Sequence, residues 1–203
     1  LVNIMGLKEH EMEFYPLGGI IVDAIEKKQK KEMIYKLHSL HDDTILFIHS
    51  GKLNPAKKTN ELIRAFSCVP DPRFRLFVIG TIAEDYNEVI QPLIKADNRI
   101  QFLGWKSKDE LTDYLCAANM YLQPGSVSAI LQNAICCGTP VMIFPHEEYE
   151  LYVKENGIRV PNENEIMKAF KEISLNPGAL VDMSKVSYQK ANEFLDYNKL
   201  AAR

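Results

Sequence analysis

Between residues 44 and 145 the sequence alternates between short apolar runs and segments whose apolar residues have helical spacing. The apolar runs, in chain order, are TILFIH, RFRLFVIG, RIQFLG, NMYLQ and PVMIFP. Helical patterns separate them, one of which is opened by Ser107 and Glu110 at capping-box spacing. Continuous apolar strands are buried on both faces, as in parallel sheets covered by helices. We therefore predict an α/β fold: a doubly wound, parallel, Rossmann-like sheet with helices on both faces.

The pattern divides the chain into three parts. Residues 1–40 are predicted to be a linker and an entering helical segment, and residues 41–175 the Rossmann-like domain. Residues 176–203 are predicted to form a C-terminal helix. Because the first residue is Leu rather than Met and the sequence stops within a helical pattern, we expect a piece of a longer protein.

Composition disfavours several classes of protein. The formal net charge of −3 lacks the basic excess that nucleic-acid-binding domains usually carry. No apolar run approaches the length needed to cross a bilayer, and the charged N-terminal stretch does not resemble a secretory signal. The lysine run in the first predicted helix is interpreted as a solvated helix face. We expect a cytoplasmic protein that does not bind nucleic acid.

The cysteines and histidines do not have the spacing of a metal site. Cysteines occur in apolar stretches, and we interpret them as small buried residues in a reducing compartment. They are Cys68, Cys116, Cys136 and Cys137. His49 is interpreted as a satisfied histidine at the end of the first strand. His146, Glu147 and Glu148 follow the fifth strand and could touch a sugar hydroxyl, but they are unconvincing as metal ligands.

Two loops are expected to meet a ligand. In an open α/β sheet the ligand binds beyond the carboxyl ends of the strands, where the strand order reverses. With the order 3-2-1-4-5, those loops are SGKLNPAKK after the first strand and QPGSVS after the fourth. The first loop nearly spells a P-loop, but Ala56 replaces its second glycine and Pro55 removes an N–H donor. A wrapped triphosphate is therefore disfavoured.

The same two loops offer groups that suit a diphosphate. Lys52 and Lys57 are predicted to emerge at the ligand end of the sheet, where two ammonium groups could bind a diphosphate without a metal ion. They could equally be solvated surface lysines. Gly125, Ser126 and Ser128 precede the next helix, whose free N–H groups and dipole favour an anion. An ordinary serine N-cap would produce the same pattern.

These motifs resemble the C-terminal, donor-binding domain of GT-B glycosyltransferases of family 4, the glycogen-synthase-like kind. The resemblance covers about residues 44–172. It is carried by SGKLNPAKKTNELIRAF, which is similar to G-[RK]-L-x-x-x-K-x-x-x-x-L-I-x-A-F, and by NAICCGTPVMIF, which is similar to E-A-M-A-x-G-T-P-V-V. KENGIRVP is similar to the N-G-L-L-V-P ending. Because the order and spacing of the motifs also match, their combination is more specific than any one of them.

The resemblance implies a retaining transferase that uses a nucleotide-diphospho-sugar and needs no metal ion. Lys52 and Lys57 would hold the donor diphosphate and stabilise the leaving nucleotide diphosphate as its charge develops. Trp105 and Lys106 match the loop that meets the base. The other positions matched to donor binding are Gly51, Gly125, Ser126, Ser128 and Asn133.

The sequence departs from the family at its pair of glutamates. Those glutamates, eight residues apart, would fall at Gly125 and Asn133. Asn133 could hydrogen-bond a ribose hydroxyl but cannot act as a carboxylate. In a divergent branch that has P-G-T-x-S-x-x-x-E-Q-A here, Gln132 occupies the acidic position. The departure supports an alternative function, a nucleotide-binding or regulatory module that has lost transferase activity.

In a complete GT-B enzyme, the acceptor is held mostly by an N-terminal domain for which this chain has no room. The resemblance therefore implies a donor-binding half in polysaccharide or glycolipid biosynthesis, with an acceptor glycan or glycolipid bound elsewhere. It also allows the full-length protein to associate peripherally with the inner face of a membrane. This chain alone is expected not to transfer sugar. A Rossmann dehydrogenase is disfavoured because G-x-G-x-x-G is absent after the first strand.

Overall fold

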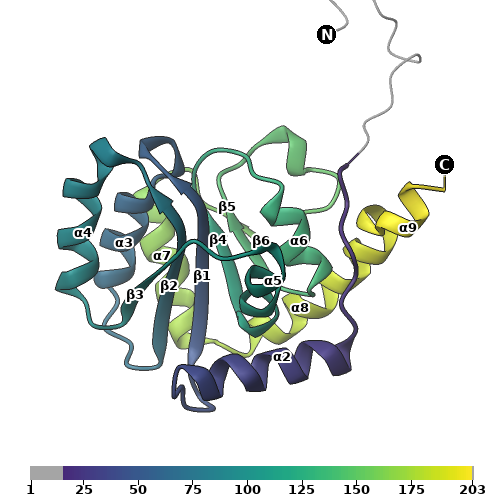
Figure 1. Ribbon diagram of the computed structural model, residues 1–203, viewed down its shortest axis with the longest axis horizontal. Helices are drawn as coiled ribbons and strands as arrows, with labels where there is room; N and C mark the ends of the chain where they lie inside the picture. Colours follow the sequence, from purple (N-terminus) through teal and green to yellow (C-terminus); the bar gives the residue numbers. More distant parts are fainter. Residues whose placement is uncertain (1–15, 203) are drawn as a thin grey trace, which may run out of the picture.

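The computed structural model describes residues 16–202, which form a six-stranded parallel sheet in the order β3-β2-β1-β4-β5-β6 (Figure 1). This confirms the predicted Rossmann-like fold and strand order. The interpretation of residues 1–15 as unlike a secretory signal lies outside the described residues. The strands are β1 (Ile45–Leu53), β2 (Phe74–Ile82), β3 (Ile100–Gly104), β4 (Met120–Gln123), β5 (Val141–Ile143) and β6 (Gly157–Arg159).

Helices cover both faces of the sheet (Figure 1). On one face lie α2 (Ala24–Leu37), α5 (Lys108–Ala117) and α6 (Ile130–Cys136), and on the other lie α3 (Thr59–Ser67), α4 (Asn87–Ala96) and α7 (Glu163–Leu175). The chain then continues through α8 (Ala179–Lys190), a π-helical turn (Ala191–Leu195) and α9 (Tyr197–Leu200). Short 3-10 turns occupy Pro55–Lys57, Glu84–Tyr86 and Glu147–Tyr149. None of the described helices is long and apolar enough to span a membrane.

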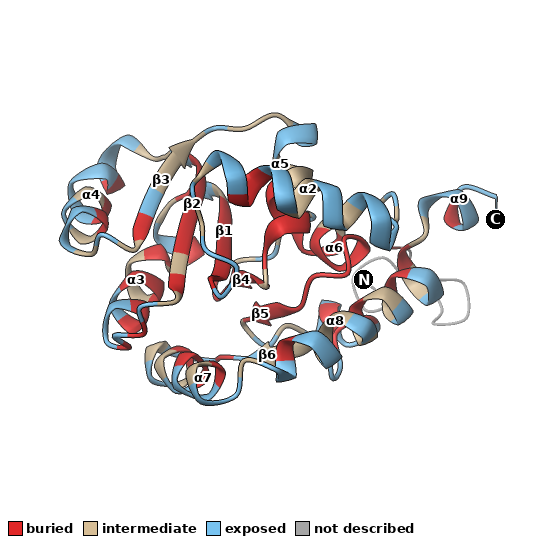
Figure 2. Cartoon of the chain, turned by 90° about the horizontal axis from the view of Figure 1, so that it is seen from below, coloured by how far each residue is buried: buried red, intermediate tan, exposed pale blue. Residues whose placement is uncertain are grey.

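The core has two halves because the side chains of β1 alternate between the faces of the sheet. Leu46 and Ile48 pack beneath α2, α5 and α6, whereas Ile45 and Phe47 pack beneath α3 and α7. Phe47 makes edge-to-face contact with Phe170 of α7, with ring centroids 5.1 Å apart. Figure 2 shows the result: buried strands between helices whose outer faces are exposed. The short, uniformly apolar runs in the sequence are thus explained by burial on both faces.

Local signals set several helix ends. The predicted capping box of α5 is present: the Ser107 hydroxyl accepts from the Glu110 N–H at 3.3 Å, and the Glu110 carboxylate accepts from the Ser107 N–H at 2.9 Å. The C-terminal pattern, however, was predicted as one helix, and the structure divides it at the π-helical turn. The division of the chain at residues 40 and 175 remains a prediction.

Two predictions about exposure are wrong in part. Three of the cysteines are buried, but Cys68 is exposed because it follows the last turn of α3 at the surface. In α2, Lys27 does not lie on a solvated face, since its ammonium donates to Gly138 O at 2.7 Å. Lys31 is also only partly exposed and lies over the ring of Tyr35. Helical spacing placed these lysines on one face, but the packing of α2 decided which of them are covered.

The segments that enter and leave the domain lie side by side. Gly19 forms a bridge with Asp196: its N–H donates to Leu195 O at 2.8 Å, and its carbonyl accepts from the Tyr197 N–H at 3.1 Å. The preceding Gly18 N–H donates to the side chain of Gln132 on α6 at 2.7 Å. The first described residues are therefore held against the last ones and against α6.

Candidate functional site

The loops after β1 and β4 meet at the carboxyl edge of the sheet, where β1 pairs with both β2 and β4. The Ser126 N–H donates to Ala56 O at 2.8 Å. A Cβ atom on Gly125 would lie 2.2 Å from the same Ala56 oxygen, so this approach requires glycine. The two predicted loops therefore touch each other directly at the topological switch point.

Lys57 is buried between these loops. Its ammonium donates to Ser126 O at 3.2 Å and to Val127 O at 3.4 Å, and burial lowers its pKa. An ammonium group has three N–H donors, so one remains for a ligand. Lys57 thus holds the second loop in place and also brings a positive charge to the carboxyl edge.

Lys52 differs from Lys57 in its setting. The first strand extends beyond its predicted end through Leu53, so Gly51 and Lys52 belong to β1 rather than to the loop. Gly51 lies opposite Gly80 of β2, and a Cβ on Gly80 would lie 1.9 Å from Gly51 O. Lys52 is exposed, and no carboxylate of the described residues forms an ion pair with it. It therefore presents an unneutralised charge.

The prediction that Ser126 and Ser128 open a helix with free N–H groups is wrong. The helix α6 begins only at Ile130. The Ser126 N–H is bonded to the first loop, and the Ser128 hydroxyl accepts from the Ile130 N–H at 3.3 Å. Gly125 and Ser126 are therefore part of the loop contact, and the Ser126 N–H is already used.

Trp105 and Lys106 lie at the same edge of the sheet but follow β3, which is separated from β1 by β2. Trp105 is 70% exposed. Lys106 has its ammonium 3.5 Å from Glu110 and 6.0 Å from the centre of the Tyr114 ring. Trp105 therefore presents a largely exposed ring at this edge, with β2 between its strand and β1.

The two positions related to the missing glutamates face the entering segment. Gln132 accepts from the Gly18 N–H and donates to the Tyr152 hydroxyl at 3.3 Å. Asn133 lines a hollow of about 660 Å³ between residues 17–22 and α5, and its Oδ1 lies 2.9 Å from a Cβ built on Gly19. The structure thus separates Asn133 from the contact between the two loops.

Three polar residues at the carboxyl edge were not singled out from the sequence. Lys58 has a left-handed backbone (φ 53°), and its ammonium lies 4.2 Å from the centre of the Phe144 ring beyond β5. The side-chain oxygens of Asn54 and Gln123 are buried and have no hydrogen-bond partner in the part of the chain that the structure describes. The sequence feature that could have identified them is their position as polar residues at or just after the ends of apolar strands. The unpartnered oxygens are acceptors that a ligand hydroxyl could satisfy.

The histidines differ in role. His49 lies inside β1 and is fully buried, with Nδ1 2.8 Å from Leu122 O and Nε2 2.9 Å from Thr59 Oγ1. Burial lowers its pKa to about 4, so it is a neutral, satisfied histidine, as predicted. His146 contacts the rings of Phe144 and Tyr149. In residues 16–202 no three histidine, cysteine or acidic side chains are grouped as a metal site would need.

Comparison with known proteins identifies a family that this sequence matches. The family model described as glycosyl transferases group 1 matches residues 29–190. No curated protein matches the sequence.

Similar folds occur in solved structures. HepE of Anabaena, in complex with UDP, has a TM-score of 0.81 at 15% identity over 97% of this chain and 57% of its own. Sucrose-phosphate synthase from Thermosynechococcus elongatus has a TM-score of 0.78 at 18% identity, over 94% of this chain and 50% of its own. The C-terminal domain of the glycosyl transferase group 1 family protein LpcC from Francisella tularensis has a TM-score of 0.69 at 17% identity, over 89% and 94%. The chain thus spans about half the length of HepE and of sucrose-phosphate synthase.

Proposed function

The chain belongs to the glycosyl transferases group 1 family, and from this premise we propose that its carboxyl edge binds the diphosphate of a nucleotide-sugar donor. The observation that carries the proposal is the meeting of the loops after β1 and β4 beside Lys52 and Lys57, neither of which has a carboxylate partner among the described residues. Phosphate oxygens are the natural partners of such ammonium groups. The similar fold of HepE, solved with UDP and with UDP-glucose, supports the proposal.

The two lysines are assigned different roles in binding the diphosphate. Lys57 is anchored by the carbonyls of Ser126 and Val127, so it offers one N–H at a fixed position. Lys52 is exposed and can move to meet the phosphates. Together they would neutralise the charge that develops on the leaving nucleotide diphosphate, which is electrostatic catalysis without a metal ion.

The remaining donor contacts are proposed from position. Trp105 offers an exposed ring for stacking against a base, with Lys106 beside it. Gly51 and Gly125 keep the backbone close to the ligand, and Ser126 and Ser128 lie next to Lys57. Asn133, farther along α6, would reach a ribose hydroxyl from the side of the entering segment.

The activity of the complete protein is also a proposal. This chain matches about half the length of HepE and of sucrose-phosphate synthase, so we propose that a further domain binds the acceptor. The complete protein would transfer a hexosyl or related group, with retention of configuration, to a glycan or glycolipid. It would act in the cytoplasm, in contact with the inner face of a membrane where the acceptor is a lipid. This chain alone would bind the donor without transferring sugar.

A second function is favoured by one observation on α6. No carboxylate occurs in this helix, and the Gln132 amide is already bonded to Gly18 and Tyr152. A donor site without carboxylates could bind nucleotide and yet not catalyse transfer. The alternative is therefore a nucleotide-binding or regulatory module that has lost its activity.

Calorimetric titration of this chain with UDP, GDP, ADP and CMP tests the proposed donor site. At least one nucleoside diphosphate should bind, and Lys52→Ala should weaken binding about tenfold, since it removes one charge-assisted contact. Lys95→Ala is the matched control, because Lys95 is an exposed lysine in the last turn of α4, away from both loops. The site would be excluded if no nucleotide binds, or if Lys52→Ala and Lys57→Ala both bind as tightly as the parent chain. A sugar-transfer assay on the full-length protein then separates the enzyme from the inactive module.

A further inference from the structure

A second hollow lies at the opposite, amino edge of the sheet. It has a volume of about 300 Å³ and is bounded by α2, α8 and the residues that precede β4 and β5. Asn119 and Pro140 line it, and they come directly before Met120 and Val141, the first residues of those strands. Because all the strands are parallel, this hollow is separated from the proposed donor site by the length of the sheet.

The hollow is positively charged. Three lysines line it and no carboxylate does: Lys27, Lys31 and Lys185. Of these three lysines, only Lys185 forms an ion pair with a described residue, the exposed Asp182 at 2.7 Å. The Lys31 ammonium lies 4.9 Å from the centre of the Tyr35 ring, and Asp42 is the acidic residue whose charge acts on its pKa. Lys27 and Lys31 are one helical turn apart, so both project from the same side of α2.

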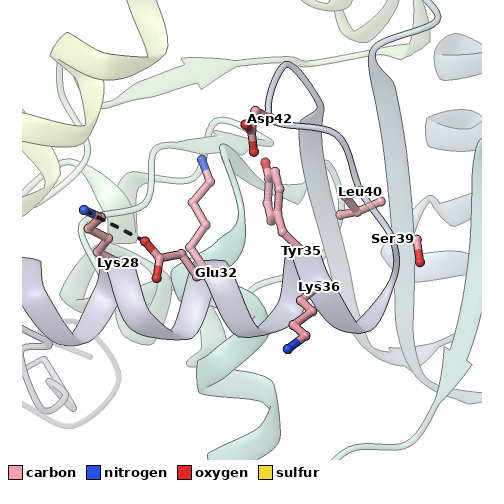
Figure 3. A pocket seen from close by; sticks show the side chains of 8 residues that line it. Lys28, Glu32, Tyr35, Lys36, Ser39, Leu40 and Asp42 are labelled. Carbon is pink, nitrogen blue, oxygen red and sulfur yellow. Dashed lines mark ion pairs between the residues drawn. The ribbon is translucent and has the colours of Figure 1, made fainter.

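A neighbouring hollow on α2 provides a contrast within the same helix. There Lys28 lies 3.9 Å from Glu32, and Tyr35 points toward Asp42 (Figure 3). Lys31 lines both hollows, and in this one it shares the space with Glu32 and Asp42. Lys27 lines only the hollow at the amino edge, which has no acidic residue in its lining.

Lys27 and Tyr188 leave donors unused in this hollow. The Lys27 ammonium donates to Gly138 O at 2.7 Å and approaches Ser184 Oγ at 3.4 Å, which leaves one of its three N–H groups. The Tyr188 hydroxyl is buried and has no hydrogen-bond partner within residues 16–202, and the centre of its ring lies 5.5 Å from the Lys27 ammonium. Burial lowers the pKa of Lys27 to about 8 because the charged form is removed from water. An anion would supply acceptors for both residues.

We propose that this hollow is a second anion-binding site, which takes a phosphate group, free or as the monoester of a small soluble molecule. Lys27 and Lys31 would supply the charge, and the Tyr188 hydroxyl would donate to a phosphate oxygen. The cavity has room for a phosphate and a small substituent, since a water molecule in the liquid occupies about 30 Å³. The site uses none of the residues assigned to the donor, so it stands whether or not the proposed function does.

Titration of ¹⁵N-labelled protein with inorganic phosphate, followed by NMR at pH 6.5, tests the proposal. The backbone amides of Gly138 and Ser184 should shift and saturate, and potassium chloride at the same ionic strength should not reproduce this. The amides of Gly51 and Gly125 report separately on any phosphate at the donor site. Shifts confined to those two glycines, or equal shifts with chloride, would overturn the proposal.

Variants make the test specific. Lys27→Met should weaken phosphate binding about tenfold, since it removes a charged donor. Tyr188→Phe removes a single hydroxyl and should weaken binding about threefold, so it decides the matter if Lys27→Met does not fold. Lys36→Met is the control, because Lys36 is exposed on α2 and does not line this hollow. Phosphate binding that is unchanged in both variants would contradict the assignment. If Lys27→Met does not fold, unchanged binding in Tyr188→Phe alone would contradict it.

Discussion

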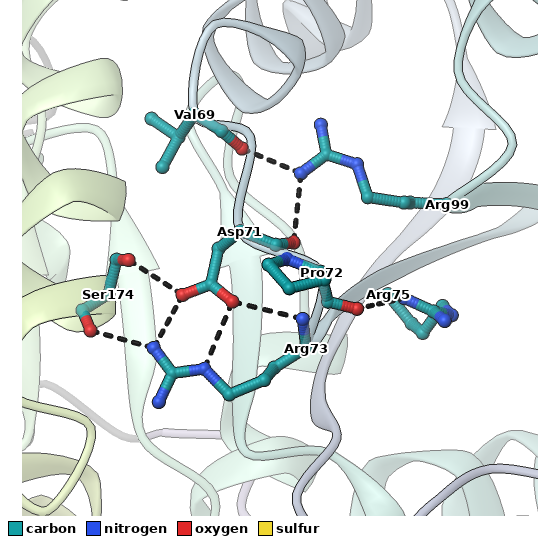
Figure 4. Close-up of polar contacts among 7 residues, drawn as sticks. All are labelled: Val69, Asp71, Pro72, Arg73, Arg75, Arg99 and Ser174. Carbon is teal, nitrogen blue, oxygen red and sulfur yellow. Dashed lines mark hydrogen bonds and ion pairs between the residues drawn. The ribbon is translucent and has the colours of Figure 1, made fainter.

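The two edges of the sheet use charged residues in opposite ways. At the amino edge, Asp71 is 6% exposed and accepts hydrogen bonds from Arg73 and from the Ser174 hydroxyl, while Arg99 donates to the carbonyls of Asp71 and Val69 (Figure 4). At the carboxyl edge, the Lys57 ammonium donates to two backbone carbonyls of the facing loop, and Lys52 has no acidic partner among the described residues. Charges are balanced at the amino-edge network and unbalanced around Lys52 and Lys57.

This difference indicates what each edge contributes. A carboxylate that is paired and fully hydrogen-bonded stabilises the fold, because each partner offsets the cost of burying the other. A lysine beside backbone carbonyls keeps its net charge, and that charge is available to an anionic ligand. The hollow at Lys27 breaks the pattern, since it places unbalanced lysines at the amino edge. That exception is the reason to propose a ligand there.

The largest expected effect is on the amino-edge network. Asp71→Asn should lower the free energy of unfolding by about 3 kcal/mol, since it leaves Arg73 without its bidentate partner. The hydrogen bonds from Arg73 hold the pKa of Asp71 well below its usual range. This contribution is complete above the unfolded pKa, about 4, and is lost as pH falls below it. Urea unfolding at pH 7 and pH 3 measures both effects. The difference between variant and parent should shrink at pH 3, and an unchanged difference would contradict the assignment.

His49, beneath the carboxyl edge, predicts a second dependence on pH. Its pKa falls from 6.5 when unfolded to about 4 in the fold because the ring is buried. The unfolded chain then binds the extra proton between these values, so stability is full above pH 6.5 and falls as pH decreases. The loss from His49 should reach about 2 kcal/mol at pH 5. NMR titration of the imidazole should give a midpoint near 4, and a midpoint near 6.5 would show that the ring is not buried.

The contact between the two loops is tested by Gly125→Ala. The new Cβ would clash with Ala56 O at 2.2 Å, so the loops must separate at a cost of about 1–2 kcal/mol in stability. The bond from the Ser126 N–H to that oxygen should open as well, so its amide should exchange faster with deuterated water. Gly178→Ala provides the control, because a Cβ there would meet no atom closer than 3.6 Å. Equal stability of the two variants would mean that the loops are not in contact.

The smallest effect is expected at an exposed ion pair between α3 and α7. Arg64 of α3 forms a bidentate pair with Glu163 at the start of α7, and both side chains are well exposed. Arg64→Ala should cost only about 0.5 kcal/mol, and 1 M salt should remove most of that difference. Thermal unfolding at low and high salt measures it. A loss comparable to that of Asp71→Asn would show that burial does not distinguish these pairs.

The fold was largely readable from the sequence because its signals are local. Apolar runs predicted the strands, and the spacing of Ser107 and Glu110 predicted the start of α5, because both depend on neighbours in the chain. For the site, the sequence predicted only which loops take part. That Lys57 is buried against Ser126 depends on a contact between residues 69 apart in the sequence. No local pattern carries that information.

The sequence by itself determined the parallel sheet and the order of its elements, and with them the carboxyl edge at which we propose that a ligand binds, because strand direction and connectivity fix that edge. Tertiary structure alone decided that Gly125 must be glycine, that the Ser126 N–H is already used and that Lys27 is covered by α8. These facts depend on distances between segments that the chain brings together only on folding. The identity of a residue gives its charge and its donors, but packing determines which of them remain available to a ligand.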